Sequence, residues 1–229
     1  ALAAVCGVSF NDASRALATF AGARRRFETK YLSSRLRVID DYGHHPTELA
    51  ATLQTARSLA PKRIVVLFQP HRFSRTQKLA DDFGRVLQAA DRVFVTDIYP
   101  ASELPIDGVS GQTIVDAMKA HGNIQAEVVG AVSQAHYAVG NALKEGDMLI
   151  TLGAGNVHEA GTKIVRDQVV LEDLLGECGE GNAKVNLYEP MRKHTTMLVG
   201  GPAQFWVEPQ THSCFASAVK YCRDRGIPV

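Results

Sequence analysis

The sequence predicts an α/β domain built on a doubly wound, mostly parallel sheet, followed by a shorter α+β segment. Between residues 35 and 170, apolar strands alternate with amphipathic helices five times, and parallel neighbours need such crossovers. The strand at 63–68 is apolar along its length, as expected for a strand that is covered on both faces. After residue 186 the pattern changes, and the 43 residues that remain are too few to bury a stable core unaided.

The composition fits a globular protein and excludes other classes. Of 229 residues, 45% are hydrophobic and 21% are charged, which is enough apolar material for a core. The 25 basic and 24 acidic residues give a formal charge of +1, so no global field would attract nucleic acid or an anionic membrane. No apolar run approaches the ~18 residues that span a bilayer. We therefore expect neither nucleic acid nor a membrane as a partner.

The cysteines indicate a reducing compartment and no metal site. Cys6, Cys178, Cys214 and Cys222 form no Cys-x-x-Cys pair and no zinc spacing with histidine. Free thiols are typical of the cytoplasm, where we expect this protein to act.

The first segment is predicted to be a helix. Asn11 or Asp12 can cap it, and apolar residues through Phe20 repeat at helical spacing. A basic run, Arg24 to Arg26, follows. This run is either a solvated charge cluster or a source of one arginine for a γ-phosphate at a domain junction.

The predicted strands and helices of the central region alternate along the chain. Pro46 suits the first turn of a helix that continues to Leu59 with one apolar face. A loop rich in Pro and Gly runs from 100 to 111. The other predicted elements are strands at 36–41, 63–68, 93–98, 126–129 and 147–152, and helices at 74–90, 112–121, 131–143 and 157–169.

The segment 171–186 is acidic and rich in glycine, and we interpret it as a linker. Residues 187–229 then contain a Gly200-Gly201 pair, an alternating strand around Trp206 and a helix at about 212–225. A second domain is predicted to begin here.

Polar residues follow the first strand, where ligands bind in parallel sheets. Asp40, Asp41, Tyr42, His44 and His45 lie between this strand and its helix. One interpretation is a pocket with a carboxylate for ribose hydroxyls and histidines for an anionic or amino substrate. The alternative is a capped turn with solvated histidines. Adjacent histidines rarely aim at one point, so a metal is not expected.

A second polar cluster follows the strand at 63–68. It contains His71, Arg72 and Arg75, and the two arginines would share a face if a helix starts at Ser74. Arginine forks bind carboxylates or phosphates at two points, and a helix N-terminus adds positive potential. The alternative is a pair of surface arginines. Because we expect both clusters at the ends of neighbouring strands, the sequence predicts one pocket for negatively charged acyl groups.

The last strand is followed by Gly153-Ala154-Gly155, which matches only part of a dinucleotide-binding motif. A tight turn and a phosphate cradle are equally compatible with it. The 229 residues contain no true phosphate loop.

Four strings together resemble the C-terminal domain of the muramyl ligase family, in particular its UDP-N-acetylmuramate:L-alanine ligases. They are DDYGHHPTE at 40–48, FQPHRFSRT at 68–76, DIYPASELPIDGVSG at 97–111 and LGAGNV at 152–157. The likeness covers about residues 1–170. It implies that 1–30, which contains GARRRFE, ends a central ATPase domain and that 31–170 is the ligase C-terminal domain.

The resemblance implies an activity and roles for residues. Such ligases use ATP and Mg, held mostly by the central domain, to activate the carboxylate of UDP-N-acetylmuramate as an acyl phosphate that L-alanine attacks. By likeness, Arg26 would contact the ATP phosphates and Asp41 the ribose. Asn156 stands where an acid is common, so it is not counted as catalytic. The residues expected to line the substrate site are Tyr42, His44, His71, Arg72 and Arg75, with the last three catalytic.

The tail resembles a different family. LYEPMRKHTTMLVGGPAQFWVEP at 187–209 is similar to the start of UDP-N-acetylenolpyruvoylglucosamine reductases, which use FAD and NADPH. Leu198 departs from the family pattern, and the sequence stops before the expected glycine-rich FAD loop. The alternative is a structural strand pair with a Gly-Gly bulge. The residues that the likeness places near FAD are His194, Thr195, Thr196, Gly200 and Gly201.

These resemblances predict a ligase–reductase fusion in cell-wall synthesis, with a truncated FAD-binding domain at 187–229. The rival hypothesis is a non-catalytic closing domain that binds nucleotide or amino acid. Since the phosphate loop is missing, we expect the 229 residues alone to be inactive.

Overall fold

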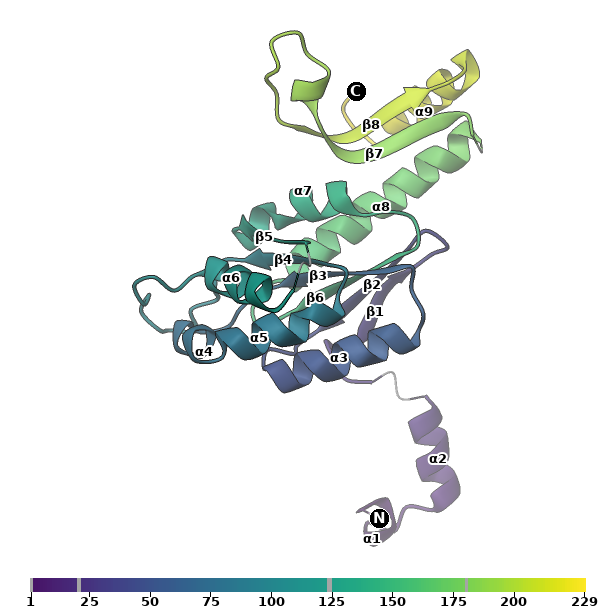
Figure 1. The fold of residues 1–229 in the computed structure, drawn as a ribbon. Coiled ribbons are helices and arrows are strands. Elements are labelled where there is room, and N and C mark those ends of the chain that lie inside the picture. The colour runs from purple at the N-terminus through teal and green to yellow at the C-terminus, as the bar shows by residue number, and fades with distance from the viewer. Residues whose placement is uncertain (1, 20–21, 123–124, 180) are drawn as a thin grey trace.

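The protein, described by a computed structural model over residues 2–19, 22–122, 125–179 and 181–229, has a six-stranded central sheet (Figure 1). The strands are β1 (Glu28–Leu32), β2 (Leu36–Asp41), β3 (Arg63–Phe68), β4 (Arg92–Thr96), β5 (Gln125–Gly130) and β6 (Asp147–Leu152). They lie in the order β1-β2-β6-β3-β4-β5, with β1 antiparallel to β2 and the other pairs parallel. The predicted doubly wound, mostly parallel α/β fold is confirmed.

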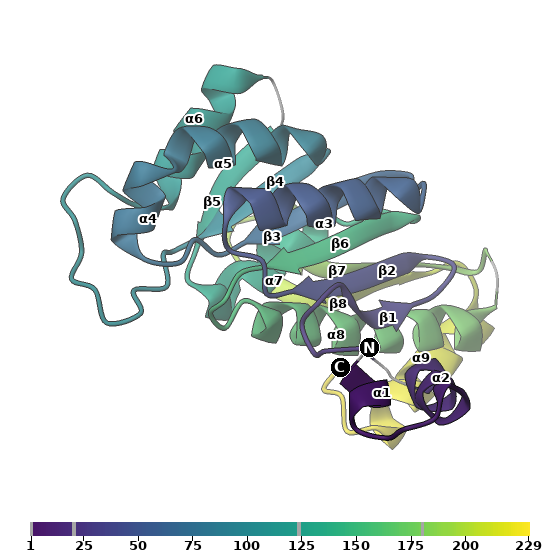
Figure 2. The same cartoon turned by 90° about the horizontal axis from the view of Figure 1, so that it is seen from below.

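Helices cover both faces of this sheet (Figures 1 and 2). They are α3 (Pro46–Ser58), α4 (Phe73–Lys78), α5 (Ala80–Val86), α6 (Gly111–His121), α7 (Val132–Ala142) and α8 (His158–Cys178). One core cluster joins α3, α5 and α6 to one face, and a second joins α7 and α8 to the other. In β3, Val65 belongs to one cluster and Val66 to the other, because successive side chains point to opposite faces.

Most predicted elements agree with the structure to within two residues. The helix expected at 74–90 is divided into α4, α5 and a 3-10 turn at Leu87–Ala89. The edge strand β1 was not predicted, because its sequence ETKYL is polar and no side chain in it is fully buried. Since β1 pairs with β2, the sheet begins before the domain boundary expected at residue 31.

The N-terminal segment forms α1 (Leu2–Val5) and α2 (Phe10–Ala18), which carry no buried residue and lie away from the sheet (Figure 1). Ser9 caps α2 by accepting a hydrogen bond from the backbone N–H of Asp12 at 3.1 Å. The expected caps, Asn11 and Asp12, lie inside the helix. Phe20 lies outside the described residues.

Helix α8 extends into the segment 171–186, which the sequence composition led us to interpret as a linker. The helix continues to Cys178, and a strand, β7 (Ala183–Pro190), starts five residues later. Leu171, Leu174 and Cys178 recur at helical spacing and are buried against the tail. This apolar stripe outweighs the acidic, glycine-rich composition on which the linker prediction was based. Glu180 lies outside the described residues.

The tail packs against the main domain along α8 (Figure 1). It consists of β7, β8 (Pro202–Pro209), which pairs with β7 in antiparallel fashion, and α9 (His212–Asp224). The hydroxyl of Tyr188 donates a hydrogen bond to Asp167 of α8 at 2.5 Å, and Gln204 donates to the same carboxylate at 2.9 Å. Burial and this hydrogen bond raise the pKa of Tyr188, which therefore stays a neutral donor. The tail is thus held by a satisfied buried polar contact as well as by apolar packing.

The ring of Tyr188 needs a glycine in α7. A Cβ at Gly140 would lie 2.3 Å from Cε2 of Tyr188, closer than real side chains approach. The missing side chain at Gly140 therefore makes room for the residue that anchors the tail.

We predict that Gly140→Ala lowers the free energy of unfolding by about 1–3 kcal/mol, because the new methyl group must displace Tyr188. Gly176→Ala is the matched control, since it is also a helical glycine but nothing lies within 4 Å of its added Cβ. That control should be neutral or stabilising by up to about 1 kcal/mol. Denaturant unfolding of both variants checks this, and equal stability would contradict the docking described here.

Candidate functional site

Three strands end at the same level at the carboxyl edge of the sheet. In the parallel ladders, Leu152 of β6 is paired with Asp41 of β2 and with Phe68 of β3. The expectation that β2 and β3 are neighbours is wrong, because β6 lies between them. Even so, the equal register delivers the segments that follow β2 and β3 to one place beyond the end of β6.

Histidines and tyrosines from different strand ends meet there. The ring centroids of His44 and His71 are 5.4 Å apart, and those of Tyr42 and His44 are 5.7 Å apart. Tyr99, which follows β4, stacks on His71 at 5.4 Å with an interplanar angle of 13°. The structure therefore brings the two predicted clusters together and adds a residue from a third strand.

The arginines point in different directions. Nη1 of Arg75 lies 3.3 Å from Nδ1 of His71, whereas Nη1 of Arg72 lies 3.9 Å from the carboxylate of Glu103. Arg72 has φ of +73°, an uncommon value for a residue with a side chain, which is often found at functional sites. A pocket of about 350 Å³ is lined by both arginines together with His45, Ser74, Lys78 and Leu79. The pocket is cationic, as expected for an anionic ligand.

The helix that begins beside the cationic pocket is short. Helix α4 has six residues and Arg72, its N-cap, makes no side-chain capping bond. The backbone N–H of Ser74 in its first turn donates to the carboxylate of Glu103 at 3.0 Å, and the contribution of this helix N-terminus to ligand binding stays a prediction.

Glu103 and Tyr99 are site residues that our sequence analysis did not single out. The carboxylate of Glu103 accepts hydrogen bonds from the hydroxyl and the backbone N–H of Ser74, at 2.7 and 3.0 Å, and these bonds lower its pKa. The backbone of Tyr99 pairs with residues 70 and 72. Both residues follow β4, so the strand-end rule applied to a third strand could have found them.

His71 is biased toward its neutral form. Burial lowers its pKa below the ordinary 6.5, and the nearby positive charges of His44 and Arg75 act in the same direction. At neutral pH this imidazole is therefore able to accept a proton.

Unlike His44, His45 caps helix α3, which agrees with the interpretation of this segment as a capped turn. Its ring accepts from the backbone N–H of Thr47 at 3.4 Å, while Glu48 accepts from the backbone N–H groups of His44 and His45 at 2.8 and 3.1 Å. Burial opposes the charged form of Glu48, but these hydrogen bonds and the charge of His44 lower its pKa overall. This capping box fixes the start of α3 and leaves the ring of His44 directed at His71.

The two residues predicted to bind nucleotide have contrasting surroundings. Asp41 is buried, and its two carboxylate oxygens accept the backbone N–H groups of Phe27 and Gly43, each at 2.7 Å. The side chain of Arg26 is 55% exposed, and its nearest charged partner is Glu48 at 3.8 Å. Asp41 thus anchors the backbone, whereas Arg26 faces outward.

The glycines after β6 are required by close packing. A Cβ at Gly155 would lie 2.4 Å from Oε1 of Gln69 and 2.7 Å from the ring of Tyr99. The side-chain amide of Gln69 bonds Asn156 and the backbone N–H of Val157, each at 3.1 Å. These contacts favour the tight-turn interpretation of this motif.

The tail residues expected near FAD form the loop between β7 and β8. His194 stacks on Trp206 at 4.1 Å, and the hydroxyl of Thr195 donates to the carbonyl of Val199 at 2.7 Å. Gly200 has φ of +134°, and a Cβ there would lie 2.8 Å from that of Met191. Thr196 and Gly201 are exposed. A tight loop on a strand pair accounts for Gly200 without a ligand, so the FAD role stays a prediction.

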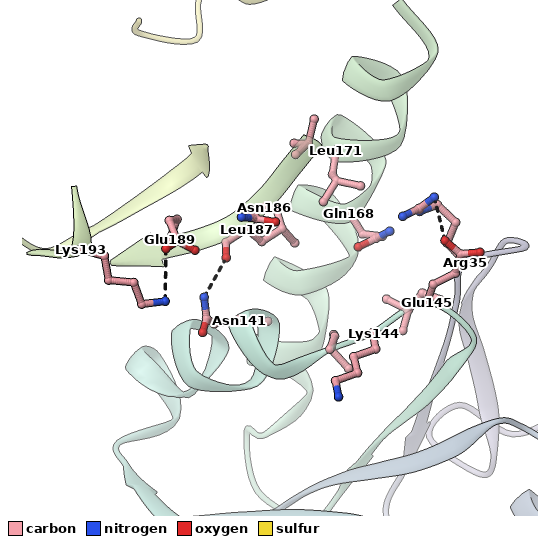
Figure 3. A pocket seen from close by; sticks show the side chains of 14 residues that line it. Arg35, Asn141, Lys144, Glu145, Gln168, Leu171, Asn186, Leu187, Glu189 and Lys193 are labelled. Carbon is pink, nitrogen blue, oxygen red and sulfur yellow. Dashed lines mark hydrogen bonds and ion pairs between the residues drawn. The ribbon is translucent and has the colours of Figure 1, made fainter. Parts of the chain in front are cut away.

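A separate pocket of about 350 Å³ lies between α7, α8, β7 and the start of β2 (Figure 3). Its charges are largely paired internally, with Arg35 bound to Glu145 at 3.0 Å and Lys193 to Glu189 at 3.2 Å. Arg35 and Glu145 precede their strands, so this pocket lies at the amino edge of the sheet. It includes none of the predicted site residues.

Within residues 2–19, 22–122, 125–179 and 181–229, no group of three or more His, Cys, Asp or Glu side chains is placed to hold a metal ion. In the same part of the chain, no helix has both the length and the apolar composition needed to cross a bilayer.

A sequence profile described as "Mur ligase, glutamate ligase domain" matches residues 25–155, which is more than half of the chain. The chain belongs to the Mur ligase family. The matched residues contain both halves of the histidine–arginine site, so the site lies within the family's domain.

Similar proteins extend this comparison. Proteins named UDP-N-acetylmuramate–L-alanine ligase from Solibacter usitatus and Nitratidesulfovibrio vulgaris are 47% and 46% identical over 150 and 160 residues. The alignments cover 66% and 69% of this chain but 32% and 35% of those proteins, so the chain spans about a third of their length. The crystal structure of a UDP-N-acetylmuramate-alanine ligase from Thermotoga maritima matches with a TM-score of 0.61 and 30% identity, over 74% of this chain and 35% of that chain.

We predict that His71 of this Mur ligase domain titrates below pH 6.5, the ordinary value. Because the folded state binds this proton less tightly than the unfolded chain, its contribution to stability falls as the pH drops below about 6.5. Arg75→Gln should move the midpoint upward, since it removes a positive neighbour. NMR titration of the histidine rings measures both effects, and a midpoint above 6.5 in the unmodified chain would contradict the geometry.

Proposed function

We propose that this chain forms the C-terminal part of an ATP-dependent ligase that joins L-alanine to UDP-N-acetylmuramate in peptidoglycan synthesis. The observation that carries the proposal is the meeting of His44, His71 and Arg75 beyond the end of β6. Membership of the Mur ligase family supports the reaction class. The balanced charge and free cysteines are consistent with action in the cytoplasm on small anionic substrates.

The proposed chemistry has two steps. The carboxylate of UDP-N-acetylmuramate attacks the γ-phosphate of ATP, giving an acyl phosphate and ADP. The amine of L-alanine then attacks the acyl carbon, an amide bond forms, and phosphate leaves. Arg72 and Arg75 would offset the charges of the carboxylates and the phosphoryl group. A neutral His71 is suited to accept the proton that the ammonium group of L-alanine must lose, once Arg75 has turned from Nδ1 of His71 to an anionic group of the substrate.

The residues near the first strand end fit a nucleotide to different degrees. Arg26 is exposed and weakly paired, so it is free to contact ATP phosphates. Each oxygen of Asp41 already accepts one backbone N–H, and a carboxylate oxygen can accept a second bond, from a ribose hydroxyl. We assign the phosphate loop and the Mg site to sequence outside these 229 residues. A closing domain without chemistry of its own remains the second candidate, favoured by the missing phosphate loop.

For the tail we propose the start of a reductase domain that uses FAD and NADPH and supplies UDP-N-acetylmuramate to the ligase. The support is the sequence string at 187–209, which forms a strand pair joined by a loop that contains His194, Thr195 and Thr196. Flavin absorbance in the purified full-length protein tests this part, and a colourless protein that takes up no FAD would contradict it.

We predict that the 229-residue chain alone neither hydrolyses ATP nor couples L-alanine, because it has no phosphate loop. Phosphate release in the presence of UDP-N-acetylmuramate, L-alanine and Mg-ATP is the measurement. Turnover by this chain would refute the assignment of the ATP site to other sequence.

In the full-length protein, we predict that Arg75→Ala reduces ligation with little change in melting temperature. A charge-assisted contact is worth ~1.5–3 kcal/mol, which corresponds to roughly tenfold to over a hundredfold in rate if it acts in the transition state. Arg85→Ala, which removes an exposed arginine from α5, is the control and should leave the rate unchanged. A large loss of stability with Arg75→Ala would instead indicate a structural role.

A further inference from the structure

The three consecutive arginines before the sheet have three different environments. Arg24 is exposed, and the side chain of Arg26 is 55% exposed. The side chain of Arg25 is only 19% exposed. The run is therefore neither a uniform solvated cluster nor three equivalent phosphate ligands.

The guanidinium of Arg25 binds two strand ends at once. Its Nε donates to the carboxylate of Asp40 at 3.0 Å, and its two terminal nitrogens donate to the carbonyls of Gly155 and Gly153 at 3.0 and 2.6 Å. Asp40 ends β2, and the glycines form the turn after β6. An arginine fork can meet three acceptors in one plane, which the single ammonium of lysine cannot do.

The backbone of Arg25 is also fixed at both ends. Its N–H donates to Glu28 at 2.8 Å, and its carbonyl accepts from the N–H of Tyr42 at 2.7 Å. Arg25 and Phe27 have φ of +56° and +48°, values that cost energy for residues with side chains. These contacts hold the strained turn in place.

Arg26 stands between these two anchored residues, next to Tyr42. The guanidinium groups of Arg25 and Arg26 lie 5.0 and 5.8 Å from the centroid of the Tyr42 ring. The side chain of Arg25 points into the protein. The side chain of Arg26, which lies between the anchored residues Arg25 and Phe27, points outward. The orientation of Arg26 and Tyr42 thus depends on a residue whose side chain is bound to Asp40, Gly153 and Gly155.

We propose that Arg25 is a positioning residue for the ligase site, which presents Arg26 to the nucleotide by tying the backbone beside it to the ends of β2 and β6. The inference rests on the proposed function and deepens it. The side chain of Arg25 hydrogen-bonds Asp40, Gly153 and Gly155 rather than His71 or Arg75, so we expect the larger effect on the nucleotide side of the site. Asp40 keeps the hydroxyl of Thr151 as a partner, at 2.7 Å, when Arg25 is replaced.

The test compares Arg25→Ala, Arg25→Lys and the control Arg24→Ala in the full-length protein. We expect Arg25→Ala to raise KM for ATP about tenfold or more while KM for L-alanine stays within about twofold. Arg25→Lys should recover part of the effect, because lysine restores only the contact with Asp40. Arg24→Ala should match the unmodified protein.

A second readout does not depend on activity. Amide hydrogen exchange in the 229-residue chain should become faster at Phe27 and Tyr42 in Arg25→Ala and stay unchanged in Arg24→Ala. Unchanged exchange, or a KM for L-alanine that rises together with KM for ATP and a falling melting temperature, overturns the positioning role. An inactive unmodified protein would refute the proposed ligase function, and the exchange result would then still decide whether Arg25 orders this segment.

Discussion

The shared register of three parallel strands is the constraint on which the site depends. Leu152 of β6 pairs with the last residue of β2 on one side and the last residue of β3 on the other. A strand slipped by one residue would turn every side chain to the opposite face and break its packing against the helices there, so the packing of both faces fixes this register. The segments after β2 and β3 are consequently released at the same height, and their histidines meet although β6 separates their strands.

Acidic side chains at this edge bind the backbone, whereas Arg72, Arg75 and Lys78 line the pocket beside α4. Glu28, Asp41, Glu48 and Glu103 each accept hydrogen bonds from backbone N–H groups of the turns. Those bonds, together with Lys30 for Glu28 and above all the hydroxyl of Ser74 for Glu103, lower the pKa values of Glu28, Glu48 and Glu103, so these carboxylates stay charged while they order the loops. Their negative charge is directed at peptide groups, and the pocket beside α4 retains its cationic character. An anion would enter a site whose positive groups are already ordered, which is the arrangement that favours charge stabilisation without reorganisation.

Helix α8 connects the two units physically. Its first turns pack on the central sheet, and its last turns pack on β7, β8 and α9. The buried hydrogen bond from Tyr188 to Asp167 fixes the position of the tail on α8. Any other position would leave these polar groups buried without a partner, which costs free energy. The tail is therefore seated on the domain rather than tethered to it by a flexible segment.

Most of the fold and part of the site could be predicted from the sequence, because they depend on patterns of neighbouring residues. Continuous apolar strands and helices with one apolar face specify a parallel sheet, and polar residues after strands indicate where its ligands bind. Resemblance added the family and assigned roles to His71, Arg72 and Arg75. What could not be predicted depended on partners distant in sequence. The polar strand β1 is defined by its pairing with β2, and the glycine-rich end of α8 is defined by its burial against the tail.

The sequence by itself determined the α/β fold, the strand ends that carry polar groups and the family to which they belong. Only the tertiary structure decided that β6 lies between β2 and β3, that Tyr99 joins the histidines, and that Arg25 alone of three adjacent arginines is turned inward. The physical reason is that a side chain's environment is set by the groups packed around it, and for Arg25 these are carbonyls about 130 residues away along the chain.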